Sequence, residues 1–210
     1  MATNPISEVV ELALYHGREE TNIEYKGDVP WTNRKKEREI MQSIFAMSNE
    51  EDGGIILIGV ADDGTRTGLS TANFATYSHD TINRRIENKG NQPIACKVDK
   101  ITLKDKVDGT EKNFVIIQVP ETREFPFVYT GGLELCNASQ PPHLSNIALR
   151  KSALYIRNKT SVGNKEIETT QEWQELIERT QRKYDRETAR RVSLRGDTKG
   201  PNPFDKELSI

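Results

Sequence analysis

The sequence predicts an α+β domain in which helices flank a mixed β-sheet. Three patterns predict it: segments with a helical period, one continuous apolar run of strand length, and two strand-like runs separated by a turn. At 210 residues the chain is long enough for one large domain, or for one domain with a tail. We expect the domain at residues 1–180 and a basic, flexible tail at residues 181–210.

The first half of the chain is expected to form helix, strand, helix and strand in turn. Apolar residues at helical spacing predict a helix over residues 6–14, which Gly17 ends. Residues 22–26 alternate apolar and polar side chains, as a strand with one charged face does. A helix over residues 33–48 follows, and the continuous apolar run at residues 55–60 is typical of a central strand covered on both faces.

The second half is expected to be richer in strands. A polar helix at about residues 81–89 precedes two β-rich runs, residues 94–103 and 113–119, which a turn joins into a hairpin. We expect one short strand near residues 127–129 and another at residues 153–157.

The last predicted helix leads into the most basic part of the chain. It begins with a capping box at Thr169 and is expected to bury Trp173, Leu176 and Ile177. Residues 179–199 contain eight cations and three acids, a net charge of +5, whereas the whole chain has −2. A basic arm on an acidic body is common in proteins that contact nucleic acid, and a solvated helix is the alternative.

Composition narrows the class of protein. A mean hydropathy of −0.71, and no apolar run near the ~18 residues of a spanning helix, argue against an integral membrane protein. Because residues 1–5 lack the features of a secretory signal, we expect a cytoplasmic protein. Cys96 and Cys136 lie too far apart for a disulfide framework or a zinc-site spacing. The sequence also lacks the motifs of a P-loop NTPase and of a serine hydrolase.

Four charged residues are candidates for a catalytic site. Glu19, Glu24 and Lys26 lie at a helix-to-strand transition, and Asp62 directly follows the apolar run at residues 55–60. If the strand that holds Glu24 pairs beside that run, the three carboxylates converge. Converging carboxylates repel unless a cation lies between them, and Mg²⁺ or Mn²⁺ is the ion that they would select. Lys26 would then offset charge on a phosphate, or be a surface partner of Glu24.

Several segments together resemble the Schlafen-type AlbA-like domain. Residues 19–26 are similar to its E-S-x-x-x-E-F-K stretch, although Glu20 stands in place of the serine. Residues 43–64 are similar to its A-F-A-N-x-x-G-G-x-x-x-x-G-V-x-D-x-G stretch, and residues 153–160 to its Y-I-R-x-G-x-x-T end. The resemblance spans about residues 6–180 in order.

The resemblance implies a Schlafen AlbA-like, nucleic-acid-binding fold and, in the branch with ribonuclease activity, a metal-dependent endonuclease that acts on structured RNA such as tRNA. Its acidic residues correspond to Glu19, Glu24 and Asp62. It also implies an antiviral or stress response, and larger members form a positive groove from two lobes, so that a single copy suggests a homodimer. The cations expected to contact phosphate are Arg34, Lys35, Lys36, Arg84, Arg85, Arg157 and Lys159.

Three functions stay open from the sequence. The first is a metal-dependent endoribonuclease, and the second is a non-catalytic module that binds DNA or RNA with its acids in structural roles. The third is an accessory subunit whose basic tail docks on a larger protein assembly.

Overall fold

The structure, a computed structural model, describes residues 16–17, 19–105, 109–122, 125–135, 147–158 and 163–196. The helix expected over residues 6–14 therefore lies outside the described residues, as does Lys159. The chain divides into two compact units, Met1–Glu168 and Thr169–Ile210. No helix in the described ranges is both long enough and apolar enough to cross a membrane.

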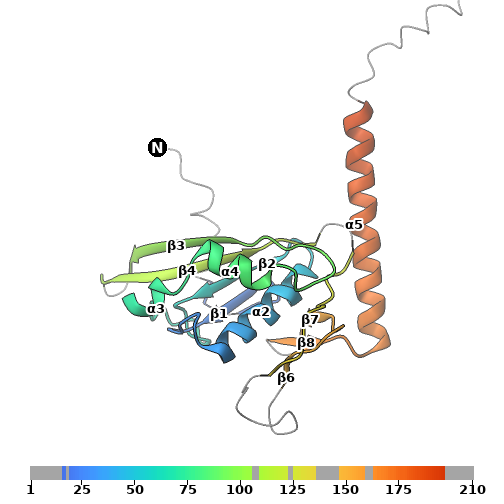
Figure 1. Ribbon diagram of the computed structural model, residues 1–210. Helices are drawn as coiled ribbons and strands as arrows, with labels where there is room; N and C mark the ends of the chain where they lie inside the picture. Colours follow the sequence, from blue (N-terminus) through green and yellow to red (C-terminus); the bar gives the residue numbers. More distant parts are fainter. Residues whose placement is uncertain are drawn as a thin grey trace, which may run out of the picture. The chain divides into compact units, whose positions relative to one another are not determined.

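The first unit is built on a four-stranded mixed sheet with the order β1-β2-β4-β3 (Figure 1). β1 (Ile23–Lys26) runs parallel to β2 (Gly54–Ile58). β4 (Glu111–Val119) runs antiparallel to β2 and forms the expected hairpin with β3 (Lys97–Lys104). A mixed sheet with helices confirms the α+β class.

Helices cover one face of this sheet (Figure 1). α2 (Arg34–Ser48) matches the expected helix closely, and the short α3 (Thr71–Ala75) was not expected. α4 (His79–Ile86) begins and ends earlier in the chain than predicted. It starts early because the Ser78 hydroxyl accepts a hydrogen bond from Thr81 N at 3.1 Å and so caps the helix.

Apolar side chains pack on both faces of β2, as its continuous apolar run predicted. Ile56 lies in a core cluster with Ile40 and Phe45 of α2. Leu57 packs instead with Tyr25 on the opposite face. Each such side chain contributes about 1.5–3 kcal/mol when fully buried, so the two clusters fix which face each strand residue points to.

The strand expected near residues 127–129 does not form. Tyr129 makes one isolated bridge, to Gly90. Phe127 is bound by the side chain of Asn49, which accepts from Phe127 N at 2.6 Å and donates to Phe127 O at 3.1 Å. The β-rich composition was misleading here because the Asn49 side chain satisfies the backbone of Phe127, while the backbone of Tyr129 bonds to Ala153 and Ser152, which lie outside any strand.

Two small antiparallel ribbons complete the described part of the first unit. β5 (Glu134–Leu135) pairs with β6 (Ile147–Leu149), and β7 (Tyr155–Arg157) pairs with β8 (Asn164–Glu166). β7 falls within the strand expected at residues 153–157 and packs against α2. The last residue of β7 is thereby carried to the sheet's helical face.

The described part of the second unit is one helix, α5 (Thr170–Gly196), which continues past residue 181, where we placed the start of the tail. The capping box is confirmed, since Glu172 N donates to Thr169 Oγ1 at 3.2 Å. The prediction that α5 buries Trp173 and Ile177 is wrong: their exposed fractions are 45% and 62%, and only Leu176 of the three is buried. Apolar spacing identifies one side of a helix but not whether another surface covers it.

Candidate functional site

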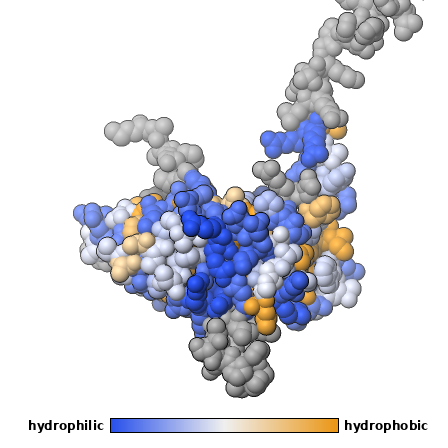
Figure 2. Space-filling view, viewed as in Figure 1, coloured by the Kyte–Doolittle hydropathy of each residue, from blue (hydrophilic) through white to orange (hydrophobic). Residues whose placement is uncertain are grey.

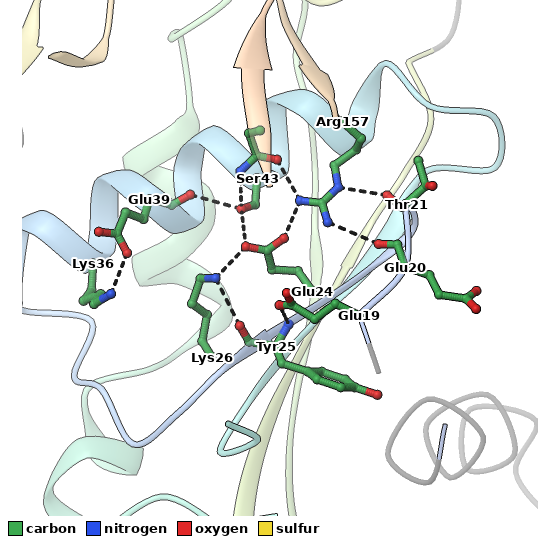
Figure 3. Close-up of polar contacts among 11 residues, drawn as sticks. Glu19, Glu20, Thr21, Glu24, Tyr25, Lys26, Lys36, Glu39, Ser43 and Arg157 are labelled. Carbon is green, nitrogen blue, oxygen red and sulfur yellow. Dashed lines mark hydrogen bonds and ion pairs between the residues drawn. The ribbon is translucent and has the colours of Figure 1, made fainter. Parts of the chain in front are cut away.

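The pairing of β1 with β2 meets the condition for the acidic residues to converge. The two strands are parallel neighbours, and Asp62 follows β2 a few residues after its end. Along β1, Tyr25 packs on one face of the sheet, whereas Glu24 reaches α2 on the other. Glu19 lies against the same strand, because its Oε1 accepts a hydrogen bond from Tyr25 N at 2.6 Å (Figure 3).

Glu24 is buried, with an exposed fraction of 4%, and both of its carboxylate oxygens are bound. Oε1 accepts from Lys26 Nζ at 2.5 Å and from the Ser43 hydroxyl of α2 at 3.3 Å. Oε2 accepts from Arg157 Nη1 at the end of β7 (Figure 3). The buried carboxylate is therefore paired, as a buried charge requires, and the three charges sum to +1.

Arg157 is 2% exposed and connects Glu24 to other segments. Its Nε donates to Thr21 O at 2.9 Å, and its Nη1 donates to Asn164 Oδ1 at 2.8 Å. Asn164 Nδ2 in turn donates to Ser43 Oγ at 2.8 Å. These contacts join β1, α2, β7 and β8. The Glu24 cluster, as we name it, consists of Glu24, Lys26, Ser43, Arg157 and Asn164.

The two glutamates of the motif have opposite pKa shifts. Burial alone raises the pKa of Glu24, but the charges of Lys26 and Arg157 outweigh burial and hold that pKa below its usual value. The pKa of Glu19 is raised, first by burial and also by the negative charges of Glu24 and Asp62, against a hydrogen bond from Tyr25 N. Glu19 is thus within electrostatic range of both other acids.

These residues, as placed, do not fit a divalent metal ion. Three carboxylate ligands would each need a free oxygen, but Lys26 and Arg157 engage both oxygens of Glu24. Within the part of the chain that the structure describes, no group of three or more His, Cys, Asp or Glu side chains is placed to hold a metal ion.

Two of the cations expected to contact phosphate are paired inside the first unit. Arg157 belongs to the Glu24 cluster. Arg85 Nε lies 2.8 Å from Glu37 Oε1, and its Nη2 lies 2.5 Å from Glu134 Oε2. Burial lowers the pKa of Arg85, but these carboxylates more than compensate and raise it. Most of the positive charge of both side chains is balanced within the fold.

The other described cations of that set lie nearer the solvent. Arg34, Lys35 and Lys36 form the first turn of α2, and Arg84 is exposed on α4. The Arg34 side chain is 70% exposed, although its Nη1 lies 3.0 Å from Glu37 Oε2. Lys36 is half-buried, and its Nζ lies 2.7 Å from Glu39 Oε2. Arg34 and Lys35 are therefore the neighbouring members of this set that are most open to solvent.

Two members of the Glu24 cluster were not expected from the sequence. Ser43 lies within the stretch that resembles the family, so the pattern contained a signal for it. Asn164 had no such signal. It reaches Arg157 because the β7–β8 register places these two residues opposite each other, which only strand pairing decides.

The low pKa of Glu24 predicts acid-sensitive stability. A carboxylate whose pKa is lower in the folded than in the unfolded state, where it is about 4.3, binds fewer protons when folded. Its contribution is therefore present above the unfolded pKa and is lost as the pH falls through the folded pKa. Urea denaturation from about pH 6 to about pH 3 should show a steeper loss of stability for the natural chain than for Glu24→Gln. Equal slopes would contradict this assignment.

Comparisons with known proteins identify the family of this chain. Eight chains of solved structures match; one, the DIP2311 protein from Corynebacterium diphtheriae, is 15% identical with a TM-score of 0.46, and the match covers 80% of this chain and 27% of that chain. No curated protein matches. The family model described as Schlafen, AlbA_2 matches residues 19–164, a segment that begins at Glu19, ends at Asn164 and contains the whole Glu24 cluster. Because this match spans well over half of the sequence, the chain belongs to the Schlafen AlbA_2 family.

Proposed function

We propose that this chain binds nucleic acid through the phosphate backbone, and that structured RNA such as tRNA is its ligand. Membership of the Schlafen AlbA_2 family suggests nucleic-acid binding. The observation that carries the proposal here is the position of three consecutive cations in the first turn of α2, of which Arg34 and Lys35 are exposed and Lys36 is half-buried.

Cations are unfavourable at this end of a helix. The N-terminus carries the positive end of the helix dipole, so each added cation is destabilising there, and Glu37 is the only acid in the first turn. The Asn33 side chain already accepts from Lys35 N and Lys36 N, so a ligand would meet the side chains of this turn and not these two amides. Arg34 and Lys36 also contact Glu37 and Glu39, and a phosphate would share these cations with the two acids. A phosphate backbone would be attracted by both the cations and the dipole.

Lys35→Glu separates binding from stability. An acid in the first turn favours the helix by about 0.3–1 kcal/mol, so the variant should be at least as stable as the natural chain while its affinity for tRNA falls roughly tenfold, or about 1.4 kcal/mol. Lys104→Glu, the same charge reversal at an exposed position of β3, is the matched control. Affinity is measured by fluorescence anisotropy with unfractionated tRNA and with single-stranded DNA. Equal losses of affinity in both variants would mean that the net charge of the chain, and not the position of Lys35, causes the effect. That result would contradict the proposed surface.

Cleavage of the bound RNA is a second candidate function, as an endoribonuclease. The raised pKa of Glu19, with Glu24 and Asp62 in electrostatic range, favours it, because raising the pKa of a carboxyl group makes it a better proton acceptor and donor in general acid–base catalysis. Glu19, Glu24, Asp62 and Lys26 are the residues that we propose for this activity. Dependence on Mg²⁺ or Mn²⁺ is part of the proposal, with Glu19, Glu24 and Asp62 as the ligands to test. Because Lys26 and Arg157 hold both oxygens of Glu24 in the arrangement described above, such an ion would have to replace one of these cations at Glu24.

Asp62→Asn tests cleavage better than a change at Glu24. Loss of Glu24 leaves Arg157 buried without its carboxylate, so the variant can fail by unfolding. Asp62 is exposed, and its exposed neighbour supplies the matched control, Asp63→Asn. With tRNA and added Mg²⁺ or Mn²⁺, we expect Asp62→Asn to lose cleavage at least 100-fold with unchanged affinity, and Asp63→Asn to keep both. If the natural chain binds tRNA but cleaves it with none of the divalent ions, the non-catalytic binding module remains as the function.

The setting of this activity completes the proposal. We propose a cytoplasmic homodimer that acts in antiviral defence, with one lobe of the nucleic-acid groove from each copy. Light scattering at micromolar concentration should give the mass of a dimer, and a strict monomer would refute that part. Absence of any salt-sensitive RNA binding would favour an accessory subunit of a larger assembly.

A further inference from the structure

α5 carries a row of cations on one face. Figure 2 shows hydrophilic side chains on this helix just before the grey C-terminal segment. With about 100° between successive residues, cations spaced at i, i+3, i+4, i+7 and i+11 fall within an arc of about 100°. The basic face of α5, as we name it, consists of Arg179, Arg182, Lys183, Arg186 and Arg190.

The acids that alternate with these cations in the sequence have other angular positions on the helix. Between residues 179 and 193 the acids are Asp185 and Glu187, and both fall outside the arc. Asp185 Oδ1 accepts from Gln181 Nε2 at 3.0 Å, and Glu187 lies 3.8 Å from Arg191, a cation on another side of the helix. Between residues 179 and 190 the arc therefore holds only cations, and Glu175 lies on the same side one turn before Arg179.

The length of the face matches an extended polyanion. At 1.5 Å per residue, Arg179 and Arg190 are about 16 Å apart along the helix axis. Three of the five side chains, those of Arg182, Arg186 and Arg190, are exposed. A row of cations over this distance can meet several successive phosphates, and each contact gains free energy from the release of counterions.

A membrane surface fits the same segment less well. An interfacial helix needs an apolar side beside its cations. The exposed apolar residues Trp173 and Ile177 lie before the basic face, in a stretch whose charged residues are all acids. Among the described residues beside the cations, the exposed large apolar side chains are Tyr184 and Val192. Two such residues do not form the apolar side that an interfacial helix needs.

We propose that the basic face of α5 is a second contact surface for the nucleic-acid backbone, in addition to the first turn of α2. This inference rests on the nucleic-acid binding proposed above and assigns part of it to the second unit. Such contacts read charge and not sequence, so they would raise affinity for many RNAs alike.

The test is the salt dependence of tRNA binding by the full chain. The slope of log K against log salt concentration changes by about 0.7–0.9 for each phosphate contact. We expect Arg182→Gln/Arg186→Gln to make the slope shallower by about 1.5. Arg191→Gln, on the same helix but off the face, should leave the slope unchanged. Arginine and glutamine have similar helix propensities, and circular dichroism checks that α5 is retained.

The outcomes separate this inference from the proposed function. A shallower slope in the double variant alone supports the basic face. If the natural chain binds tRNA and the double variant has an unchanged slope, or if Arg191→Gln has a similar effect per cation removed, the basic face is rejected while nucleic-acid binding stands. No binding by the natural chain overturns both. Loss of binding to phosphatidylserine vesicles, without a change for tRNA, would assign the face to lipid and overturn the inference.

Discussion

Arg157→Ala is expected to lower the free energy of unfolding of the first unit by about 3–5 kcal/mol, because it breaks a buried ion pair and leaves one oxygen of the buried Glu24 without its guanidinium partner. The guanidinium also donates to Thr21 O and Asn164 Oδ1, so its loss leaves further acceptors unsatisfied. Urea denaturation followed by circular dichroism measures the change.

Arg150→Ala is the matched control. Arg150 pairs with both oxygens of Glu166, but its side chain is 60% exposed, so water replaces the lost contacts and the change should be much smaller. A similar loss of unfolding free energy in both variants would contradict the prediction that the buried Arg157 stabilises the fold more than the exposed Arg150.

A double substitution shows whether charge or packing causes the loss of stability in Arg157→Ala. Replacing both partners of the buried pair, as in Glu24→Met/Arg157→Met, removes the buried carboxylate and leaves Lys26, whose side chain is 15% exposed, as the remaining charge of the cluster. The double variant should therefore recover part of the stability lost in Arg157→Ala. Failure of the double variant to recover any stability would mean that packing, and not charge, is what Arg157 supplies.

Asn49→Ala is expected to cost about 3 kcal/mol, the second of the two large effects, because three backbone groups lose their partner. Asn49 Nδ2 donates to Phe127 O at 3.1 Å and to Tyr155 O at 3.0 Å, and Asn49 Oδ1 accepts from Phe127 N at 2.6 Å. The side chain thus joins the end of α2 to β7 and to the loop that was expected to be a strand. All of these contacts are buried, so water cannot replace them readily.

Another asparagine side chain that contacts the loop around Phe127 supplies the control. Asn91 Nδ2 donates to Pro126 O at 3.0 Å and Asn91 Oδ1 accepts from Val128 N at 2.9 Å, but Asn91 is exposed. Asn91→Ala should therefore cost less than half as much as Asn49→Ala in the same urea measurement. Equal costs would show that burial does not set the penalty.

Local patterns in the sequence determined much of the framework. The apolar run that became β2, the hairpin of β3 and β4, the helix that became α2 and the capping box of α5 all depend on residues close together in the chain. Alternation along β1 likewise placed Tyr25 and Glu24 on opposite faces of the sheet. Side-chain periods of two and about 3.6 residues give such information without any long-range contact.

Only the tertiary structure decided what the charged residues contact. From the sequence, Arg157 and Arg85 were equivalent to Arg34 as candidates for phosphate contact, but the fold buries Arg157 on Glu24 and pairs Arg85 with Glu37 and Glu134. The exposure of Trp173 and the side-chain contacts of Phe127 were decided in the same way. The physical reason is that the environment of a charged or apolar side chain depends on segments far away in the chain. A local sequence pattern contains no information about those segments.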